Sequence, residues 1–124
     1  HQVEGLMIDR DISIPNLIAM AQTLLAEVMK RPVELRVRPG YFPFVEPGVE
    51  VYIQGSSGKL AGKWLEVAGA GMVHQNVFEQ VGYVRGEMQG FAFGMALERM
   101  AMLKHKIDDI RLFNGGDLRF LQQF

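Results

Sequence analysis

Gln2 and Glu4 stand two positions apart near the start of the chain. In a β-strand, side chains at i and i+2 point to the same face, so this amide and this carboxylate would lie side by side. Such a pair can hold a ligand ammonium group, because the carboxylate supplies charge and the amide donates or accepts hydrogen bonds. The same pattern fits the polar side of an edge strand, and both interpretations stay open.

A second candidate is the segment Arg38–Pro47 (RPGYFPFVEP), which has three aromatic residues and three prolines in ten positions. Proline stiffens the backbone, and the rings would form a rigid apolar wall suited to a flat hydrophobic ligand. The alternative is a proline-rich loop that plugs the core.

Small residues at strand spacing form a third candidate, since Gly90, Ala92 and Gly94 would share one face and leave a floor for a ligand. Arg99 follows in a helical segment, where its guanidinium could pair with phosphate or stack on a base. The alternative is tight helix–sheet packing with a surface arginine. VAGAG at Val67–Gly71 is a second run of small residues that would let a ligand approach the backbone.

Other chemistry finds little support in the sequence. The three histidines are far apart, no G-x-S-x-G motif or phosphate-binding glycine loop is present, and the chain has no cysteine. A net charge of -1 argues against an autonomous nucleic-acid binder. With 124 residues, 48% of them hydrophobic, the composition predicts one globular domain.

Periodicity predicts the elements that must position these residues. An alternating first segment indicates a strand, and Ser13 and Pro15 then begin an amphipathic helix that ends at Arg31-Pro32. Three strands, a helix, a strand and a helix follow, which favours an α+β domain with an antiparallel sheet. The expected ranges are strands 1–9, 33–38, 49–54, 64–68 and 90–94, and helical segments 72–80, 95–105, 107–113 and 118–124.

Five segments in order resemble one family, the alpha subunits of bacterial phenylalanyl-tRNA synthetases, which are class II aminoacyl-tRNA synthetases. They are HQVEGL, RPGYFPFVEP, GKWLEVAGAGMVH, GFAFGMALERMAML and IDDIRLF with DLRFLQQF. The resemblance extends over essentially all of the chain. It implies an antiparallel sheet flanked by helices, and a cytoplasmic (αβ)2 enzyme that activates phenylalanine with ATP and Mg²⁺ and then charges tRNA.

The resemblance also implies roles for single residues. For phenylalanine, it implies that Gln2 and Glu4 bind the ammonium group. Phe42, Phe44 and Val45 would form an apolar wall for the ring, and Ala92 and Gly94 would form the pocket floor. Arg99 resembles the motif 3 arginine that contacts ATP and serves catalysis. Gly69 and Gly71 would admit the nucleotide, and Glu66 is similar to the acidic residue near the magnesium ion.

Four departures from the family pattern are visible. Gln75 stands where the family usually has proline, Ala96 where it has a second glycine, and Tyr52 where an acidic residue is expected. Asn114–Asp117 replaces a more aromatic and acidic stretch. The added methyl group of Ala96 is expected to reduce nucleotide affinity.

The resemblance further implies a single domain, residues 1–124, running from the second strand of motif 2 through motif 3 to the family's natural C-terminus. Motif 1 and the first strand of motif 2 would be missing, so the first strand should have an unpaired edge and the chain should self-associate or pair with another chain such as the beta subunit. Two functions remain: part of a ligase whose isolated activity is weak or absent, or a non-catalytic piece that retains phenylalanine binding or only the fold.

Overall fold

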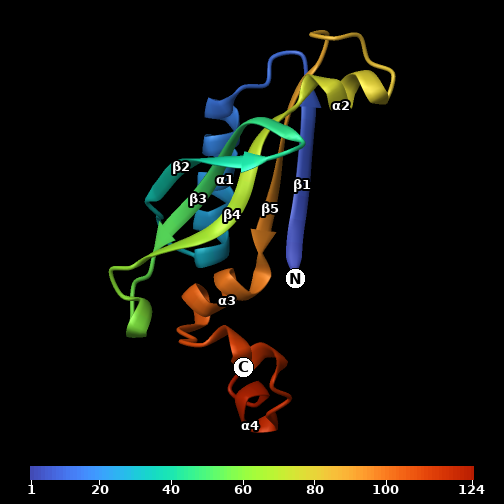
Figure 1. Cartoon of the computed structure of the whole chain (residues 1–124). Coiled ribbons are helices and arrows are strands. Elements are labelled where there is room, and N and C mark those ends of the chain that lie inside the picture. The colour runs from blue at the N-terminus through green and yellow to red at the C-terminus, as the bar shows by residue number, and fades with distance from the viewer.

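A computed structural model describes all residues, 1–124. Its five strands form one antiparallel sheet in the order β1-β5-β4-β3-β2, with the longest helix on one face and shorter helices at both ends (Figure 1). The elements are β1 Gln2–Asp9, α1 Ile14–Met29, β2 Leu35–Phe42, β3 Val45–Gln54, η1 Gly58–Leu60, β4 Trp64–Val73, α2 Gln75–Gln80, β5 Gln89–Ala96, α3 Leu97–His105, η2 Ile110–Asn114 and α4 Leu118–Leu121. The predicted α+β class and order of the main elements are confirmed. None of the helices has the length and apolar character needed to cross a membrane.

Helix α1 begins and ends as its sequence predicts. At its N-terminus, the backbone N–H and the hydroxyl of Ser13 both donate to the side-chain oxygen of Asn16, and Pro15 occupies the first turn. At its C-terminus, Lys30 adopts a left-handed conformation (φ 54°), and its N–H donates back to the last turn. Leu17, Ala21, Leu25 and Met29 are buried along one side of this helix.

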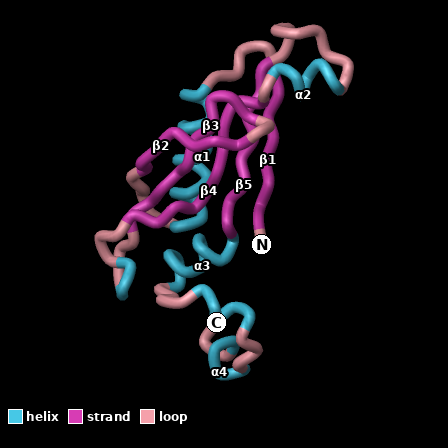
Figure 2. Tube along the Cα trace, viewed as in Figure 1, coloured by secondary structure: helices cyan, strands magenta, loops and turns pink.

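The core lies between α1 and one face of the sheet, with α3 closing one end. Its largest cluster joins α1 residues to alternate residues of the central strands and to the apolar side of α3. Members of this cluster include Leu25, Val51, Ile53, Ala68, Met95 and Leu103. A second cluster, which includes Leu17, Val49, Ala70 and Phe91, continues the core toward α2. The opposite face of the sheet has no helix packed on it (Figure 2).

Several predicted boundaries were wrong, for a common reason. The hairpin β2–β3 continues through Phe42 and Val45, so much of Arg38–Pro47 is strand and not a plugging loop. Met72 still pairs with Phe91 of β5, so helix α2 begins only at Gln75. Met95 and Ala96 likewise remain in the β1–β5 ladder, and α3 begins at Leu97. In each case the sheet hydrogen bonds extend further than the local pattern suggests.

The contribution of the α1 face to stability can be measured at Leu25, whose side chain is fully buried. Leu25→Ala should lower the free energy of unfolding by about 2–5 kcal/mol, because it removes buried apolar area and leaves a cavity. Gln22→Ala, at an exposed position of the same helix, should change it by less than about 0.5 kcal/mol. Chemical denaturation of both variants tests this, and equal losses would contradict the assignment of the core.

Candidate functional site

The uncovered face of the sheet has glycine or alanine at several neighbouring positions of β4 and β5. Residues directly opposite each other in neighbouring strands project from the same face, so the strand register defines rows across it. One row consists of Glu4, Gly94, Gly69, Glu50 and Arg38. The next consists of Leu6, Ala92, Gly71, Gly48 and Gly40. The two runs of small residues singled out in the sequence therefore lie side by side, on β4 and β5.

Two recognition groups rest directly on this floor. A Cβ atom at Gly94 would lie 2.8 Å from Oε1 of Glu4, so the carboxylate of β1 lies over the β5 backbone. A Cβ atom at Gly69 would lie 2.8 Å from Cζ of Phe42, so the ring from the end of β2 lies over the β4 backbone. Because Gly94 and Gly69 are paired neighbours, the structure brings a carboxylate and an aromatic ring together on adjacent glycines.

The other residues predicted to bind phenylalanine lie around Glu4 and Phe42. Gln2 shares the face with Glu4 and is opposite Ala96. Val45 is buried, and its side chain lies over Gly71, where an added Cβ would be only 2.8 Å away. Phe44 differs, since it lies in the β2–β3 turn and is 59% exposed. The structure therefore brings together most of the residues predicted to bind phenylalanine, but the Phe44 side chain is largely exposed to solvent.

Three of the four residues predicted to bind the nucleotide or its metal ion line a polar cavity of about 310 Å³ at the α3 end of the floor: Glu66, Gly69 and Arg99. Arg99 and Glu66 face each other there: Nη1 of Arg99 donates to the Glu66 carbonyl oxygen at 2.8 Å and lies 3.3 Å from carboxylate Oε2. Nδ1 of His1 lies 2.5 Å from Oε1 of Glu98 on another part of the rim. The lining residues are His1, Gln2, Glu66, Val67, Ala68, Gly69, Gly94, Ala96, Glu98 and Arg99. Gly71 is not among them, and it lies one row further along the floor.

The metal-binding capacity of this face is limited. Glu66 is the predicted metal-adjacent residue, and its side chain is 40% exposed. No three His, Asp or Glu side chains lie close enough together to hold a metal ion by themselves. A divalent cation would therefore need most of its oxygen ligands from a bound phosphate and from water, as Mg²⁺ usually does.

On the β2–β3 side of the same face, Tyr52, Glu50 and Arg38 contact one another in a way that sequence reasoning missed. The Tyr52 hydroxyl donates to Oε2 of Glu50 at 2.7 Å, and this bond to a carboxylate raises the pKa of Tyr52 above its ordinary value. The Arg38 guanidinium lies 5.1 Å from the centre of the Tyr52 ring. Arg36 lies in the same way 4.1 Å from the centre of the Trp64 ring. The alternating pattern of Val33–Arg38 places both arginines on one face, but their aromatic partners come from other strands.

Gln75 also has a role that sequence reasoning missed. Its side-chain NH₂ donates to the Met88 carbonyl at 3.1 Å, and its side-chain oxygen accepts from the Gly86 N–H at 3.0 Å. Arg85 of the same loop donates to Asn76 and Glu79 of α2. The departure from proline at this position thus supplies an amide that ties the loop before β5 to α2.

Comparison with known proteins extends these findings. The family model described as tRNA synthetases class II core domain (F) matches residues 1–124. The chain is 50% identical to the phenylalanine–tRNA ligase alpha subunit of Colwellia psychrerythraea, and 49% identical to those of a Marinomonas species and Proteus mirabilis. Each alignment covers the whole chain but only 36%, 38% and 37% of these relatives. The chain therefore belongs to the family of class II tRNA synthetase core domains (F), and it resembles phenylalanine–tRNA ligase alpha subunits over about a third of their length.

Proposed function

We propose that this chain is part of a phenylalanine–tRNA ligase and supplies its phenylalanine-binding floor together with part of its ATP site. The observation that carries the proposal is the placement of the Glu4 carboxylate and the Phe42 ring on adjacent glycines of one bare sheet face. A cation-binding group and an apolar ring on neighbouring positions of one face match the chemistry of the two ends of an aromatic amino acid.

Phenylalanine would be recognised at both ends. Glu4, with Gln2 beside it, would bind the ammonium group through charge-assisted hydrogen bonds. Phe42 would pack against the substrate ring, because aromatic pairs favour edge-to-face or offset contact. Phe44 and Val45 would extend this wall, while Ala92 and Gly94 would form the floor and limit its depth.

ATP would occupy the polar cavity next to the amino acid. The Arg99 guanidinium would contact the nucleotide, and the bare backbone at Gly69 and Gly71 would allow it to approach the sheet. In the reaction, a substrate carboxylate oxygen attacks the α-phosphorus, a new O–P bond forms, and the bond to pyrophosphate breaks. Arg99 would act as a catalytic residue by stabilising charge on the phosphates, so the chemistry depends on positioning and charge and needs no acid–base pair.

The Mg²⁺ ion that the family implies fits the donor set as an ion shared with the nucleotide. Glu66 supplies an exposed carboxylate at the cavity, and one or two carboxylates with phosphates and water are a usual environment for Mg²⁺. When bound, the ion would neutralise phosphate charge. Glu66 would hold it, and Arg99 would then be free to turn toward the phosphates.

The complete reaction would belong to a larger cytoplasmic assembly. The relatives are named as alpha subunits and are nearly three times as long as this chain, so tRNA(Phe) and a beta subunit would be engaged by the longer protein. The isolated chain would have weak activity or none. A non-catalytic piece that retains phenylalanine binding or only the fold is the second candidate, and the amino-acid groups Glu4 and Phe42 on adjacent glycines would serve binding without catalysis.

Gly94→Ala tests the amino-acid site. The added methyl group would displace the Glu4 carboxylate, so the Kd for phenylalanine should rise about tenfold or more, as expected for losing a charged hydrogen bond. Gly115→Ala is the matched control, because its Cβ would meet no atom closer than 3.6 Å. Calorimetric titration measures both, and unchanged affinity in Gly94→Ala would contradict the proposed site.

Phenylalanine-dependent ATP–pyrophosphate exchange tests catalysis. If the chain catalyses exchange, Arg99→Ala should lower the rate by about 10²–10³-fold, which is typical of losing one charge-stabilising group. Arg119→Ala, at an exposed arginine that does not line the cavity, should leave the exchange rate unchanged. Phenylalanine binding without exchange would support the non-catalytic candidate. Neither binding nor exchange would contradict both.

A further inference from the structure

The Phe42 ring lies against the backbone of three neighbouring strands. A Cβ atom added at Gly40 of β2 or at Gly48 of β3 would lie 3.2 Å from a ring atom. One added at Gly69 of β4 would lie 2.8 Å from Cζ of the ring. These glycines allow the ring to approach the sheet closely, but they have no side chains that would stop it from sliding across the face. Another group must therefore fix where the ring lies.

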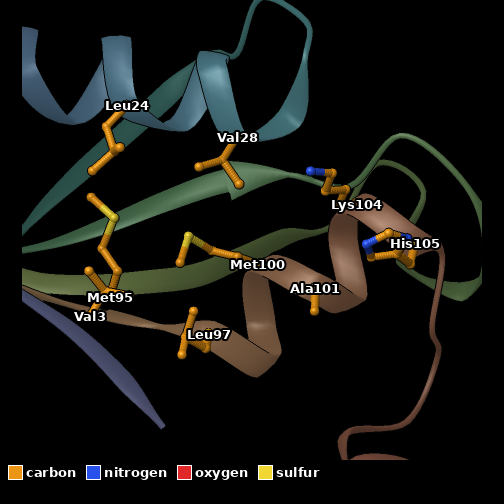
Figure 3. A pocket seen from close by; sticks show the side chains of 9 residues that line it. All are labelled: Val3, Leu24, Val28, Met95, Leu97, Met100, Ala101, Lys104 and His105. Atoms are coloured by element: carbon orange, nitrogen blue, oxygen red, sulfur yellow. The ribbon is translucent and has the colours of Figure 1, made fainter. Parts of the chain in front are cut away.

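The covered face of the sheet fixes its side chains in a different way. There, apolar groups from two layers face one another, as Figure 3 shows for Leu24 of α1 opposite Met95 of β5. Packing between the layers determines where such groups lie. No helix of this chain packs on the open face (Figure 2), so a side chain there depends on directed contacts with its neighbours, such as hydrogen bonds.

Glu50 of β3 is the neighbour that meets the Phe42 ring. The Cβ position at Gly40 that lies 3.2 Å from Cε2 of Phe42 also lies 2.9 Å from Cγ of Glu50, so the two side chains approach the same point. Glu50 is opposite Gly69 on β4, but its side chain leans the other way, over Gly40 of β2. The Glu50 side chain therefore occupies the β2 side of the ring.

Tyr52 accounts for the position of the Glu50 carboxylate. Arg38 and Glu50 are directly opposite each other on β2 and β3, where opposite charges ordinarily pair, yet no ion pair joins them. The Tyr52 hydroxyl instead donates to Oε2 of Glu50 at 2.7 Å, and the Arg38 guanidinium lies over the Tyr52 ring. Because the bond to this carboxylate raises the pKa of Tyr52, the hydroxyl keeps its proton and remains a donor at neutral pH.

We propose that Tyr52 and Glu50 are positioning residues, which hold the Phe42 ring over Gly69 and so keep the aromatic wall of the amino-acid site in place. The inference rests on the proposed function, because the position of the ring affects phenylalanine only if phenylalanine binds beside it. Without the Tyr52 hydroxyl, the Glu50 carboxylate would turn to Arg38, its partner across the strands. The space beside the ring would then open, and the ring would move toward β2, away from the substrate.

The chemistry of this support requires a hydrogen-bond donor at position 52. An acidic residue, which the family pattern leads us to expect there, would have no proton to donate and would repel Glu50. Tyr52 is therefore a residue by which this chain holds its aromatic wall in its own way.

Tyr52→Phe tests the positioning role, because it keeps the ring beneath Arg38 and removes only the hydroxyl. The Kd for phenylalanine should rise about three- to tenfold, as expected for breaking one contact in a connected network. Tyr41→Phe is the matched control, since it makes the same change at a side chain that is 84% exposed, and it should leave the Kd unchanged. Calorimetric titration measures both, and equal Kd values for Tyr52→Phe and the unmodified chain would overturn the proposal.

Variants of Glu50 test whether Tyr52 acts through this carboxylate. Glu50→Ala should raise the Kd for phenylalanine by a similar factor, whereas Glu50→Gln should largely preserve it, because the amide oxygen still accepts from Tyr52. Adding Tyr52→Phe to Glu50→Ala should cause no further loss, since the hydroxyl then has no partner to hold. Losses that multiply in the double variant would contradict a shared role.

Nuclear magnetic resonance of the ligand-free chain separates this inference from the proposed function. A ring held over Gly69 shifts the α-proton resonances of that glycine upfield. Tyr52→Phe and Glu50→Ala should each reduce this shift, and Tyr41→Phe should not. A chain that binds no phenylalanine would contradict the proposed function, and the Gly69 resonances would still decide whether Tyr52 and Glu50 hold the ring. Resonances that stay unchanged in both variants would overturn the inference.

Discussion

The structure depends on a separation between the two faces of one sheet. On the covered face, large apolar side chains from alternate positions pack against α1 and supply the burial that stabilises the fold. On the open face, adjacent strands carry glycine or alanine at the same rows, so the backbone itself is the surface. Because strand side chains alternate, each residue serves one face only, and the open face can remain bare without weakening the core.

This bare face determines how the candidate site is built. Recognition groups come from strands beside the glycines and lean over them, as Glu4 does over Gly94 and Phe42 over Gly69. A side chain at either glycine would occupy the space that these groups use. The glycines are therefore needed for close approach, and Gly94 and Gly69 show no positive φ that would give another reason for glycine.

The parts of the fold that were predictable are those decided by local chemistry. Ser13 and Pro15 mark the start of α1, and strict alternation in Val49–Gln54 identifies a strand. The Pro- and Gly-rich stretch before it gave no such signal, because its pairing is imposed by the partner strand. The same limit applies to side chains: strand spacing put Gln2 and Glu4 on one face, but the contact between Arg99 and Glu66 joins residues 33 positions apart. Such contacts follow from register, which a single sequence does not display.

The Arg99–Glu66 contact also bears on whether the cavity can accept a nucleotide. Both side chains are more than a third exposed, so water screens the pair, and an ion pair of this kind contributes only about 0–1 kcal/mol. A hydrogen bond from a guanidinium to a phosphate is charge-assisted, and bonds to charged groups contribute about 1.5–3 kcal/mol. Replacing the Arg99–Glu66 ion pair by a hydrogen bond from Arg99 to a phosphate therefore lowers the free energy, provided that a cation binds to the released Glu66 carboxylate. The ion pair in this chain is thus no obstacle to the binding of ATP and Mg²⁺ that we propose.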